Sequence, residues 1–411
     1  MNAEIIGVGT ELLLGQIANT NAQRISQALA SIGVDVYRHT AVGDNLTRAT
    51  ESIEEALGRA GVVIITGGLG PTPDDLTRDA IAAALGLELE RDPDLVEGLK
   101  AFFAGRNRAM PEDNLKQADL PHGAHVIAPE GTAPGFYLER DGRLVFALPG
   151  VPWEMEGMLT KTVLPVLRER AGKQVTISRE VIVLGLGESS VHDRIRELVD
   201  AQTNPTIAYL AGFGQVRVRL TAKGGSEAEA LAVISPIEEK VRDLLGEDAV
   251  EGHHGSLAVA LGAMLRDRGA NVAVAESLTG GLIAAELTNV GGSGDYFLGS
   301  LVCYTTEAKG TVAGIDEAIL MGPGAVSEEA AAALAEAAIS RFDADLGLSA
   351  TGVAGPAEQE GVPVGVIYVG ATFGGRTEVR KVRGYGDRHN VRCFAVTAAL
   401  DLGRRVLLRH G

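Results

Sequence analysis

A serine near the carboxyl end of the chain stands in a setting that suits a nucleophile. Ser277 follows an apolar run typical of a buried strand, and Gly280 and Gly281 follow it before a helical pattern begins. A hydroxyl at such a junction is exposed and has free backbone N–H groups beside it, which is the layout of a nucleophile with an oxyanion hole. Serine and threonine are also common helix caps, so the pattern alone leaves a structural role for Ser277 open.

A serine nucleophile needs a base, and a lysine is the candidate here. The eight histidines show no spacing that suggests a Ser-His-Asp triad. Lys309 comes just beyond a strand predicted over residues 298–304, so it reaches the same sheet edge as Ser277 if the two strands are parallel. Most lysines are solvated surface groups, and that ordinary role is the alternative for Lys309.

Two further segments predict a pocket at this edge. Residues 349–356 follow another apolar strand and again offer glycines, so three loops meet where strands end. Arg388 and Arg392 are four residues apart and therefore share one face of the last helix, near a capped N-terminus that suits a monophosphate. The alternative is a helix face that simply exposes basic side chains to water.

A second candidate site lies in the first third of the chain, where a strand predicted over residues 62–66 leads into a glycine-rich loop. The glycines let backbone N–H groups approach a ligand, and a helix that opens near Asp74 directs its positive end at the same place, which suits a phosphate or pyrophosphate. Adjacent carboxylates beside a phosphate indicate a bridging divalent metal at Asp74 and Asp75, although Asp74 could instead cap the helix. The loop reads Gly67-Gly68-Leu69-Gly70-Pro71-Thr72-Pro73-Asp74-Asp75-Leu76-Thr77.

This loop resembles the molybdopterin-binding domain of the MoaB/MogA type, in the form that opens proteins of the CinA (competence/damage-inducible) family. Residues 9–15, 19–21, 131–135 and 149–152 match as well, so the resemblance covers about the first 160 residues. It implies an ADP-ribose pyrophosphatase that requires a divalent metal of unknown identity, although a pterin phosphate would ask for the same donors. The implied ligand-binding residues are Thr10, Glu11, Gly67, Gly68, Gly70 and Thr72, with Asp74 and Asp75 on the metal.

The carboxy-terminal elements resemble the CinA carboxy-terminal domain, a nicotinamide mononucleotide (NMN) deamidase described as a Ser/Lys amidohydrolase, for which no cofactor is expected. The matching segments are residues 275–281, 304–309, 324–328, 351–356, 363–365 and 386–392. The resemblance implies Ser277 as nucleophile and Lys309 as base. The residues that it implies around them are Tyr304, Thr279, Gly280, Gly281, Thr351, Gly352 and Gly355. Leu278 stands where many members have cysteine, a difference that spares the nucleophile.

The elements that must position these residues alternate along the chain. Strand runs and helical patterns alternate over residues 4–66 and again over residues 257–408, which indicates stacked βα units with mostly parallel sheets. Residues 176–250 instead suggest a small α+β unit. The predicted fold class is therefore α/β, with two α/β domains that have parallel-type sheets, at residues 1–170 and 251–411, joined by a KH-like module at residues 171–250.

The middle module carries no evident chemistry. A KH domain that binds nucleic acid would need a GxxG loop between helices, and the nearest match, Gly185 with Gly187, is too short. We therefore expect a spacer or dimerisation unit. His253 and His254 follow in a segment that we interpret as a solvated linker, with a metal site as the alternative.

Composition narrows the function classes. Among 411 residues, 37 Lys and Arg stand against 54 Asp and Glu, and the resulting charge of −17 repels nucleic acid, with no basic patch to offset it. Cys303 and Cys393 are the only cysteines, too few for a disulfide framework. The first apolar run, residues 5–8, is too short for a signal peptide or membrane span. We expect a cytoplasmic homodimer that binds small nucleotides and neither nucleic acid nor membranes.

These observations lead to one functional hypothesis with two rivals. The hypothesis is a bifunctional hydrolase of pyridine-nucleotide salvage, which deamidates NMN at one site and cleaves ADP-ribose with a divalent metal at the other. The first rival is a molybdopterin-binding protein of cofactor metabolism. The second is an interaction protein for competence or recombination without enzymatic activity.

Overall fold

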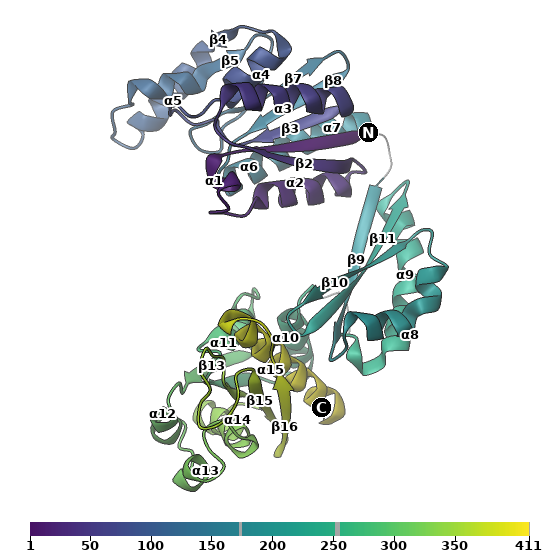
Figure 1. Cartoon of the computed structure of the whole chain (residues 1–411), viewed down its shortest axis with the longest axis vertical. Helices are drawn as coiled ribbons and strands as arrows, with labels where there is room; N and C mark the ends of the chain where they lie inside the picture. Colours follow the sequence, from purple (N-terminus) through teal and green to yellow (C-terminus); the bar gives the residue numbers. More distant parts are fainter. Residues whose placement is uncertain (172–174, 251–254, 411) are drawn as a thin grey trace. The chain divides into compact units, whose positions relative to one another are not determined.

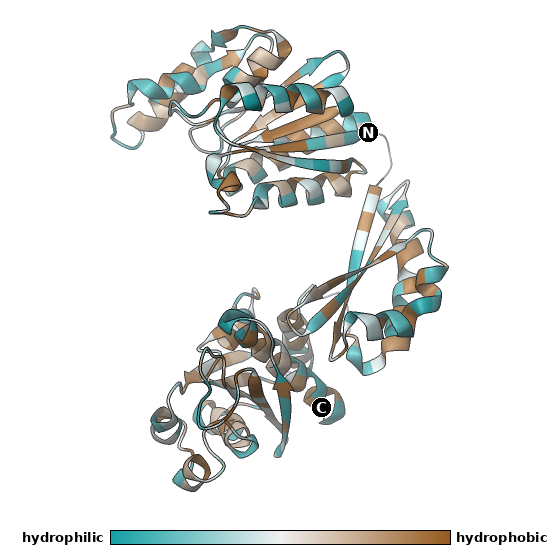
Figure 2. Cartoon of the chain, viewed as in Figure 1, coloured by the Kyte–Doolittle hydropathy of each residue, from teal (hydrophilic) through white to brown (hydrophobic). Residues whose placement is uncertain are grey.

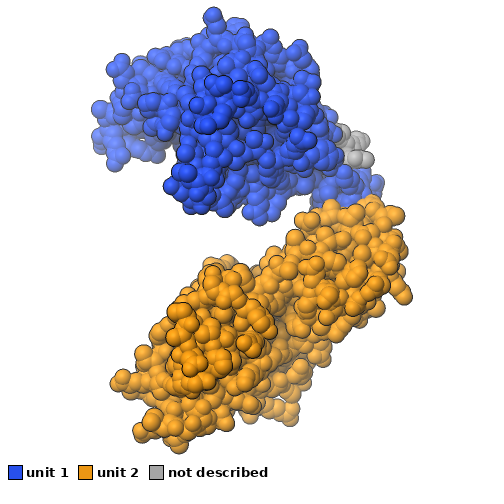
Figure 3. Space-filling model, viewed as in Figure 1, with its two compact units in different colours: residues 1–177, 222–232 blue, residues 178–221, 233–411 orange. Residues whose placement is uncertain are grey.

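The computed structural model describes residues 1–171, 175–250 and 255–410, and the chain divides into two compact units. Unit 1 comprises Met1–Ile177 with Ala222–Ala232, and unit 2 comprises Ser178–Thr221 with Val233–Gly411 (Figure 3). Among the described residues, no helix is both long and apolar enough to cross a membrane.

The first unit is built on a six-stranded sheet in which parallel strands form the centre (Figure 1). Strands β1, β2, β3 and β8 are mutually parallel, whereas β7 and β6 add an antiparallel edge. This edge departs from a fully parallel sheet because a tight turn at Asp141 and Gly142, both with positive φ, joins β7 to β8. In sheet order the strands are β2 (Asp35–Val42), β1 (Asn2–Val8), β3 (Val62–Thr66), β8 (Arg143–Leu148), β7 (Gly135–Arg140) and β6 (His125–Ile127).

Helices cover both faces of this sheet. Side chains along β1 alternate, so that Ala3 and Ile5 join one buried cluster while Ile6 and Val8 join the other. The central strand β3 is correspondingly apolar along its length (Figure 2). The helices are α1 (Thr10–Leu13), α2 (Thr20–Ser31), α3 (Leu46–Arg59), α4 (Thr77–Leu85), α6 (Pro152–Met158), the π-helical η2 (Leu159–Val163) and α7 (Leu164–Ala171).

A segment between α4 and β6 was not anticipated from the sequence, because its strands are too short to show a hydrophobic period. It contains a two-stranded antiparallel ribbon and lies next to the loop that follows β3, since Lys116 Nζ donates to the backbone oxygen of Asp75 at 2.7 Å. Its elements are β4 (Leu89–Arg91), α5 (Pro93–Ala104), η1 (Glu112–Ala118) and β5 (Asp119–Pro121).

The middle module has the predicted α+β composition. Its three-stranded sheet has the order β10-β11-β9, and it carries two long helices. The elements are β9 (Val175–Leu184), α8 (Glu188–Asp200), β10 (Thr206–Gly212), β11 (Gln215–Gly224), α9 (Glu227–Leu245) and η3 (Gly246–Asp248).

The carboxy-terminal sheet has five strands in the order β13-β12-β14-β15-β16. The first three are parallel, so the carboxyl ends of β12, β13 and β14 meet at one edge. Strands β15 and β16 are antiparallel additions, and β16 was not predicted. The strands are β12 (Val272–Glu276), β13 (Phe297–Val302), β14 (Leu346–Gly352), β15 (Val366–Phe373) and β16 (Arg376–Arg383).

Helices again cover both faces of this sheet. Val272 and Val274 of β12 join a cluster with the helices α10, α11 and α15, whereas Ala273 and Ala275 pack with α14. The helices are α10 (Leu257–Arg268), α11 (Leu282–Thr288), η4 (Ser293–Asp295), α12 (Thr306–Thr311), α13 (Glu317–Met321), α14 (Glu328–Phe342) and α15 (Arg388–His410).

Candidate functional sites

Ser277 and Lys309 meet in a buried contact. Lys309 Nζ lies 3.0 Å from Ser277 Oγ, and the two residues are 1% and 6% exposed. Parallel pairing explains the contact, because Glu276 at the end of β12 lies beside Val302 at the end of β13. Ser277 directly follows β12 and Lys309 lies in α12, the helix after β13, so the two side chains meet at this edge of the sheet, as the sequence predicted.

The environment of Lys309 favours its neutral form. Burial lowers the pKa of Lys309 below its ordinary value of 10.5, and this effect exceeds the opposite influence of Cys303 and Glu360. A neutral amine next to a hydroxyl can accept its proton, so the pair has the geometry and the electrostatics of an activated serine. Cys303 is an unsuitable nucleophile by comparison, because burial raises the pKa of its thiol.

A buried carboxylate that sequence reasoning missed fixes the loop after Ser277. Glu276 is 0% exposed, and its two oxygens accept the backbone N–H groups of Gly281, Ile283 and Ala284 at 2.9–3.0 Å. It also accepts the Ser300 hydroxyl at 3.1 Å. A carboxylate at the last position of an apolar strand, ahead of a helix, is the signal that could have identified it.

A pocket of about 400 Å³ opens in front of Ser277. Arg388 lies at its rim, where the guanidinium donates to the Tyr304 hydroxyl and to the Gly355 carbonyl oxygen. Five predicted site residues line the pocket: Ser277, Tyr304, Gly352, Gly355 and Arg388. The other lining residues, which were not predicted as site residues, are Leu278, Val353, Ala354, Ala357 and Gln359.

The other predicted residues of this site do not line the pocket. Thr351 is fully buried and donates its hydroxyl to the Ala325 carbonyl oxygen at 2.7 Å. Thr279 is also fully buried. Arg392 donates to two backbone carbonyl oxygens of the loop that follows Ser277, at 3.0 and 2.7 Å. Arg392 is not among the residues that line the pocket, and the expectation that it anchors a substrate phosphate stays a prediction.

In the first unit, the first residues of α4 bind carbonyl oxygens of the glycine loop 67–70. Thr77 Oγ1 donates to the Gly67 carbonyl oxygen at 2.7 Å, and the buried Arg78 donates to the carbonyl oxygens of Leu69 and Gly70 at 2.9 and 2.7 Å. The loop carbonyls therefore face the protein. Within the described parts of the chain, the N–H groups of Leu69 and Gly70 donate no hydrogen bond, so they are available to a ligand.

Glycine is required where this loop leaves the sheet. Gly67 has a φ of +102°, and a Cβ at this position would lie 2.2 Å from the Val8 carbonyl oxygen. Gly68 has a φ of +65°, and its Cβ would meet the Thr77 hydroxyl. A side chain at either position would prevent the loop from passing this close to Val8 and Thr77.

The prediction that a helix opens near Asp74 is wrong. Helix α4 begins at Thr77, and its cap, Leu76, makes no side-chain hydrogen bond. Asp74 instead accepts the Thr72 hydroxyl, and this contact holds the pKa of Asp74 below its ordinary value. Asp75 accepts the Thr72 N–H at 2.9 Å. The side chains of Asp74 and Asp75 therefore both bind Thr72, and these hydrogen bonds hold the turn between β3 and α4.

Carboxylates dominate the pocket of about 940 Å³ in front of this loop. Two that were not predicted are Asp44, which accepts the N–H and hydroxyl of Thr10 at 2.9 and 2.7 Å, and Glu154, whose pKa is raised by burial. Thr10 thus supports Asp44 and does not itself line the pocket. The acidic lining residues are Glu11, Asp44, Asp74, Asp75 and Glu154, and no lysine or arginine of the described chain lines the pocket.

The residues present suit a metal that is shared with a ligand better than one enclosed by protein. The described residues hold no group of three or more His, Cys, Asp or Glu side chains that could bind a metal by themselves. Mg²⁺ is commonly held by one or two carboxylates together with substrate phosphates. Asp74 and Asp75 fit that role. His253 and His254 lie outside the described residues.

Comparisons with known proteins cover the chain from end to end. A probable molybdopterin binding domain matches residues 4–169, the KH domain of damage-inducible protein CinA matches residues 178–250, and the CinA C-terminal domain matches residues 254–407. A CinA-like protein of Frankia casuarinae is 46% identical over 99% of this chain and 96% of its own length. A putative competence-damage inducible protein of Moorella thermoacetica is 44% identical over 98% of both chains.

A solved structure gives a partial match. The CinA protein of Thermoplasma acidophilum is 36% identical and covers 40% of this chain and 99% of its own, with a TM-score of 0.38. The KH domain match agrees with the KH-like middle module that the sequence predicted.

Proposed function

The chain belongs to the CinA family, and we propose that its carboxy-terminal domain is an amidase that converts NMN and water to nicotinate mononucleotide and ammonia. The observation that carries this proposal is the buried 3.0 Å contact between Lys309 Nζ and Ser277 Oγ. A desolvated lysine with a lowered pKa can serve as the base that a serine nucleophile needs.

The proposed reaction proceeds through an ester on Ser277. Neutral Lys309 accepts the hydroxyl proton while Oγ attacks the carboxamide carbon. The resulting ammonium of Lys309 then gives a proton to the departing nitrogen, which leaves as ammonia. A water molecule that gives its proton to Lys309 hydrolyses the ester, and Ser277 recovers its proton from Lys309.

Arg388 supports the choice of a nucleotide substrate. Its guanidinium is at the rim of the pocket that contains Ser277, and a cation at this place can form charge-assisted hydrogen bonds to a monophosphate. The carboxamide ring would then occupy the inner end of the pocket, next to the serine.

We also propose a second activity, metal-dependent cleavage of ADP-ribose at the amino-terminal pocket. Two observations support it: the free N–H groups of the loop 67–70 suit a phosphate, and five carboxylates face the same space. An anionic diphosphate would be repelled by those carboxylates unless a cation bound with it. A divalent metal held at Asp74 and Asp75 would supply this positive charge and polarise the diphosphate.

A direct assay tests both activities. The purified chain is incubated with NMN and with ADP-ribose, with and without a chelator, and the products are identified. We expect ammonia and nicotinate mononucleotide from NMN whether or not chelator is present. We expect AMP and ribose 5-phosphate from ADP-ribose only without chelator. Absence of ammonia would refute the amidase, and cleavage of ADP-ribose that survives the chelator would refute the metal.

The amino-terminal pocket also suits a pterin phosphate, since the loop offers the same donors to either ligand. Calorimetric titration of ADP-ribose and of a molybdopterin-type ligand separates the two functions. Tight binding of the pterin with no binding of ADP-ribose would favour a role in cofactor metabolism.

A further inference from the structure

We infer that Arg392 positions the nucleophile loop, defined as residues 277–281, and does not bind the substrate phosphate. This inference rests on the proposed amidase function. Arg392 Nε donates to the Leu278 carbonyl oxygen at 3.0 Å, and its terminal nitrogen donates to the Thr279 carbonyl oxygen at 2.7 Å. Arg392 is not among the residues that line the pocket, whereas Arg388 is, so its two loop contacts are those of a support rather than of a ligand-binding residue.

A cation and an anion hold the backbone in and just after the nucleophile loop: the cation binds carbonyl oxygens, and the anion binds N–H groups. Arg392 binds carbonyl oxygens at residues 278 and 279, while Glu276 accepts the N–H groups of Gly281, Ile283 and Ala284. The Gly280 N–H closes a turn on the Ser277 carbonyl at 3.0 Å. Each of these contacts restrains the direction of a peptide unit beside the nucleophile.

Two N–H groups of the loop are left over. Those of Leu278 and Thr279 donate no hydrogen bond within the parts of the chain that the structure describes. An amide that loses ammonia passes through a tetrahedral intermediate with a negatively charged oxygen, and backbone N–H groups next to the nucleophile are the usual donors to it. Leu278 also lines the pocket. Thr279 is fully buried and does not line the pocket, so the Leu278 N–H is the donor that the loop offers to this oxygen.

Arg392 fixes the direction of this donor through the backbone. Its contact with the Leu278 carbonyl oxygen holds the peptide unit that follows Leu278, and its contact with the Thr279 carbonyl oxygen holds the next one. The Leu278 N–H therefore keeps one direction beside Ser277, and Arg392 acts on the reaction without touching the substrate.

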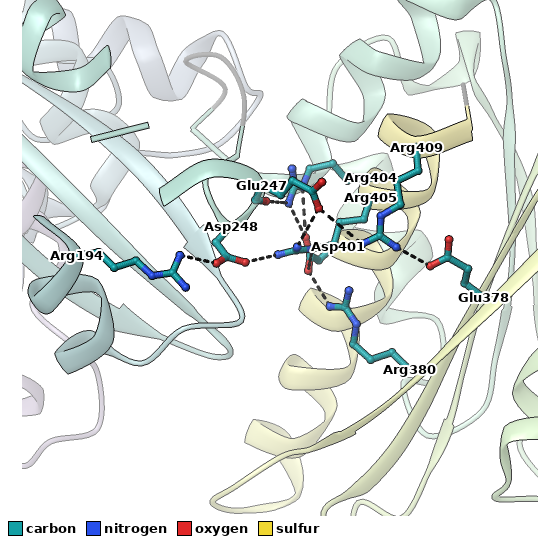
Figure 4. A network of polar contacts seen from close by, with 9 residues as sticks. All are labelled: Arg194, Glu247, Asp248, Glu378, Arg380, Asp401, Arg404, Arg405 and Arg409. Atoms are coloured by element: carbon teal, nitrogen blue, oxygen red, sulfur yellow. Dashed lines mark hydrogen bonds and ion pairs between the residues drawn. The ribbon is translucent and has the colours of Figure 1, made fainter. Parts of the chain in front are cut away.

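The helix that carries Arg392 is itself well anchored. Asp401 of α15 is buried and binds Arg380, Arg404 and Arg405 at 2.9–3.0 Å, and Arg405 continues to Asp248 of η3 (Figure 4). This network fixes the carboxyl half of α15, the helix whose amino half carries Arg392. The same helix also supplies Arg409, which pairs with Glu378 away from the pocket.

Steady-state kinetics distinguishes Arg392 from Arg388. Arg388→Ala should raise KM for NMN roughly ten- to a hundredfold, with a much smaller change for the dephosphorylated nicotinamide riboside. Arg392→Ala should instead lower kcat roughly ten- to a hundredfold for both compounds, with KM nearly unchanged. Arg392→Lys should recover part of the loss, and Arg409→Ala, which removes an arginine from the same helix, should match the wild type.

A covalent probe tests the inference independently of NMN. A fluorophosphonate reacts with an activated serine when Oγ bonds to phosphorus, fluoride leaves and the hydroxyl proton passes to the base, while the phosphoryl oxygen occupies the oxyanion position. We expect labelling of Ser277 to be slowed roughly tenfold or more by Arg392→Ala and to keep the wild-type rate in Arg409→Ala. Melting temperatures of all variants identify any that fail to fold, and Arg392→Lys replaces Arg392→Ala in that case.

The two experiments separate the inference from the proposed function. If the wild type is labelled at Ser277 but does not deamidate NMN, the substrate is wrong and the labelling rates alone decide the role of Arg392. Labelling that Arg392→Ala leaves unchanged, or a loss confined to KM for NMN, overturns the inference. Failure of the wild type to be labelled at Ser277 overturns it as well, together with the serine nucleophile.

Discussion

The glycine loops of the two units are built alike and face different surroundings. Each follows a buried strand that pairs with parallel neighbours, and in each an arginine donates to two successive loop carbonyl oxygens: Arg78 to residues 69 and 70, and Arg392 to residues 278 and 279. In front of the first loop lie five carboxylates, whereas Ser277 in the second loop contacts a buried lysine. The shared loop presents backbone N–H groups, and the neighbouring charges decide what chemistry those groups serve.

The two pockets also differ in size, and the amino-terminal pocket is the larger. Under the proposed function, the larger pocket would take ADP-ribose and the smaller one NMN. A motif of strand, glycine loop and helix is therefore a support, and its function has to be argued from the side chains that face it.

The largest effect that we expect comes from breaking the Ser277–Lys309 pair. Ser277→Ala and Lys309→Ala should each lower kcat/KM for NMN deamidation by roughly a thousandfold or more, and the double mutant should scarcely be worse, because members of a catalytic unit are not additive. Ammonia release measures the effect, and ADP-ribose cleavage by the same samples is the control for folding. Full activity in Ser277→Ala, with loss in Cys303→Ala, would replace the pair by a thiol.

The acidic amino-terminal pocket should respond to the loss of one carboxylate. Asp75→Asn should lower metal-dependent ADP-ribose cleavage roughly a hundredfold, since the metal would lose a charged ligand, while NMN deamidation stays as in the wild type. Asp94→Asn, an exposed carboxylate of α5, is the matched control. Equal cleavage by both variants at every metal concentration would remove Asp75 from the metal site.

Arg78 tests whether the two loops depend on arginine in the same way. Arg78→Lys leaves at least one of the carbonyl oxygens of Leu69 and Gly70 without its donor, so we expect a loss of about 1–3 kcal/mol in unfolding free energy and roughly tenfold weaker ADP-ribose binding. Denaturant titration and calorimetry provide the two values. Unchanged binding in a destabilised variant would show that Arg78 supports the fold alone.

The smallest expected effect concerns stability. Burial lowers the pKa of Lys309 in the folded chain, so the unfolded chain binds that proton more tightly and folding stability rises with pH between the lowered pKa and 10.5. Lys309→Met abolishes this contribution. The variant should therefore gain most over the wild type near neutral pH, and its advantage in melting temperature should shrink as pH approaches about 10. A difference that stays constant with pH would contradict a buried neutral lysine.

The sequence predicted those features that depend on a single apolar run or on the alternation of strands and helices. Strand β3 was predicted over the residues that form it, and the meeting of Ser277 with Lys309 followed from the parallel strands β12 and β13. Asp44 and Glu154 could not be predicted, because they reach the first pocket from elements that do not contain the glycine loop. The loop contacts of Arg392 could not be predicted for a related reason: helical spacing with Arg388 gives a shared face, but not which face meets the loop.

The pH dependence of NMN deamidation tests the central claim most directly, because it reports whether the base of Ser277 is a lysine with a lowered pKa. In our account kcat/KM rises with pH as Lys309 loses its proton and levels off below 10.5, the ordinary lysine value. A profile that is flat from about pH 6 to 10, or one that rises only around 10.5 and above, would contradict the Ser277–Lys309 amidase.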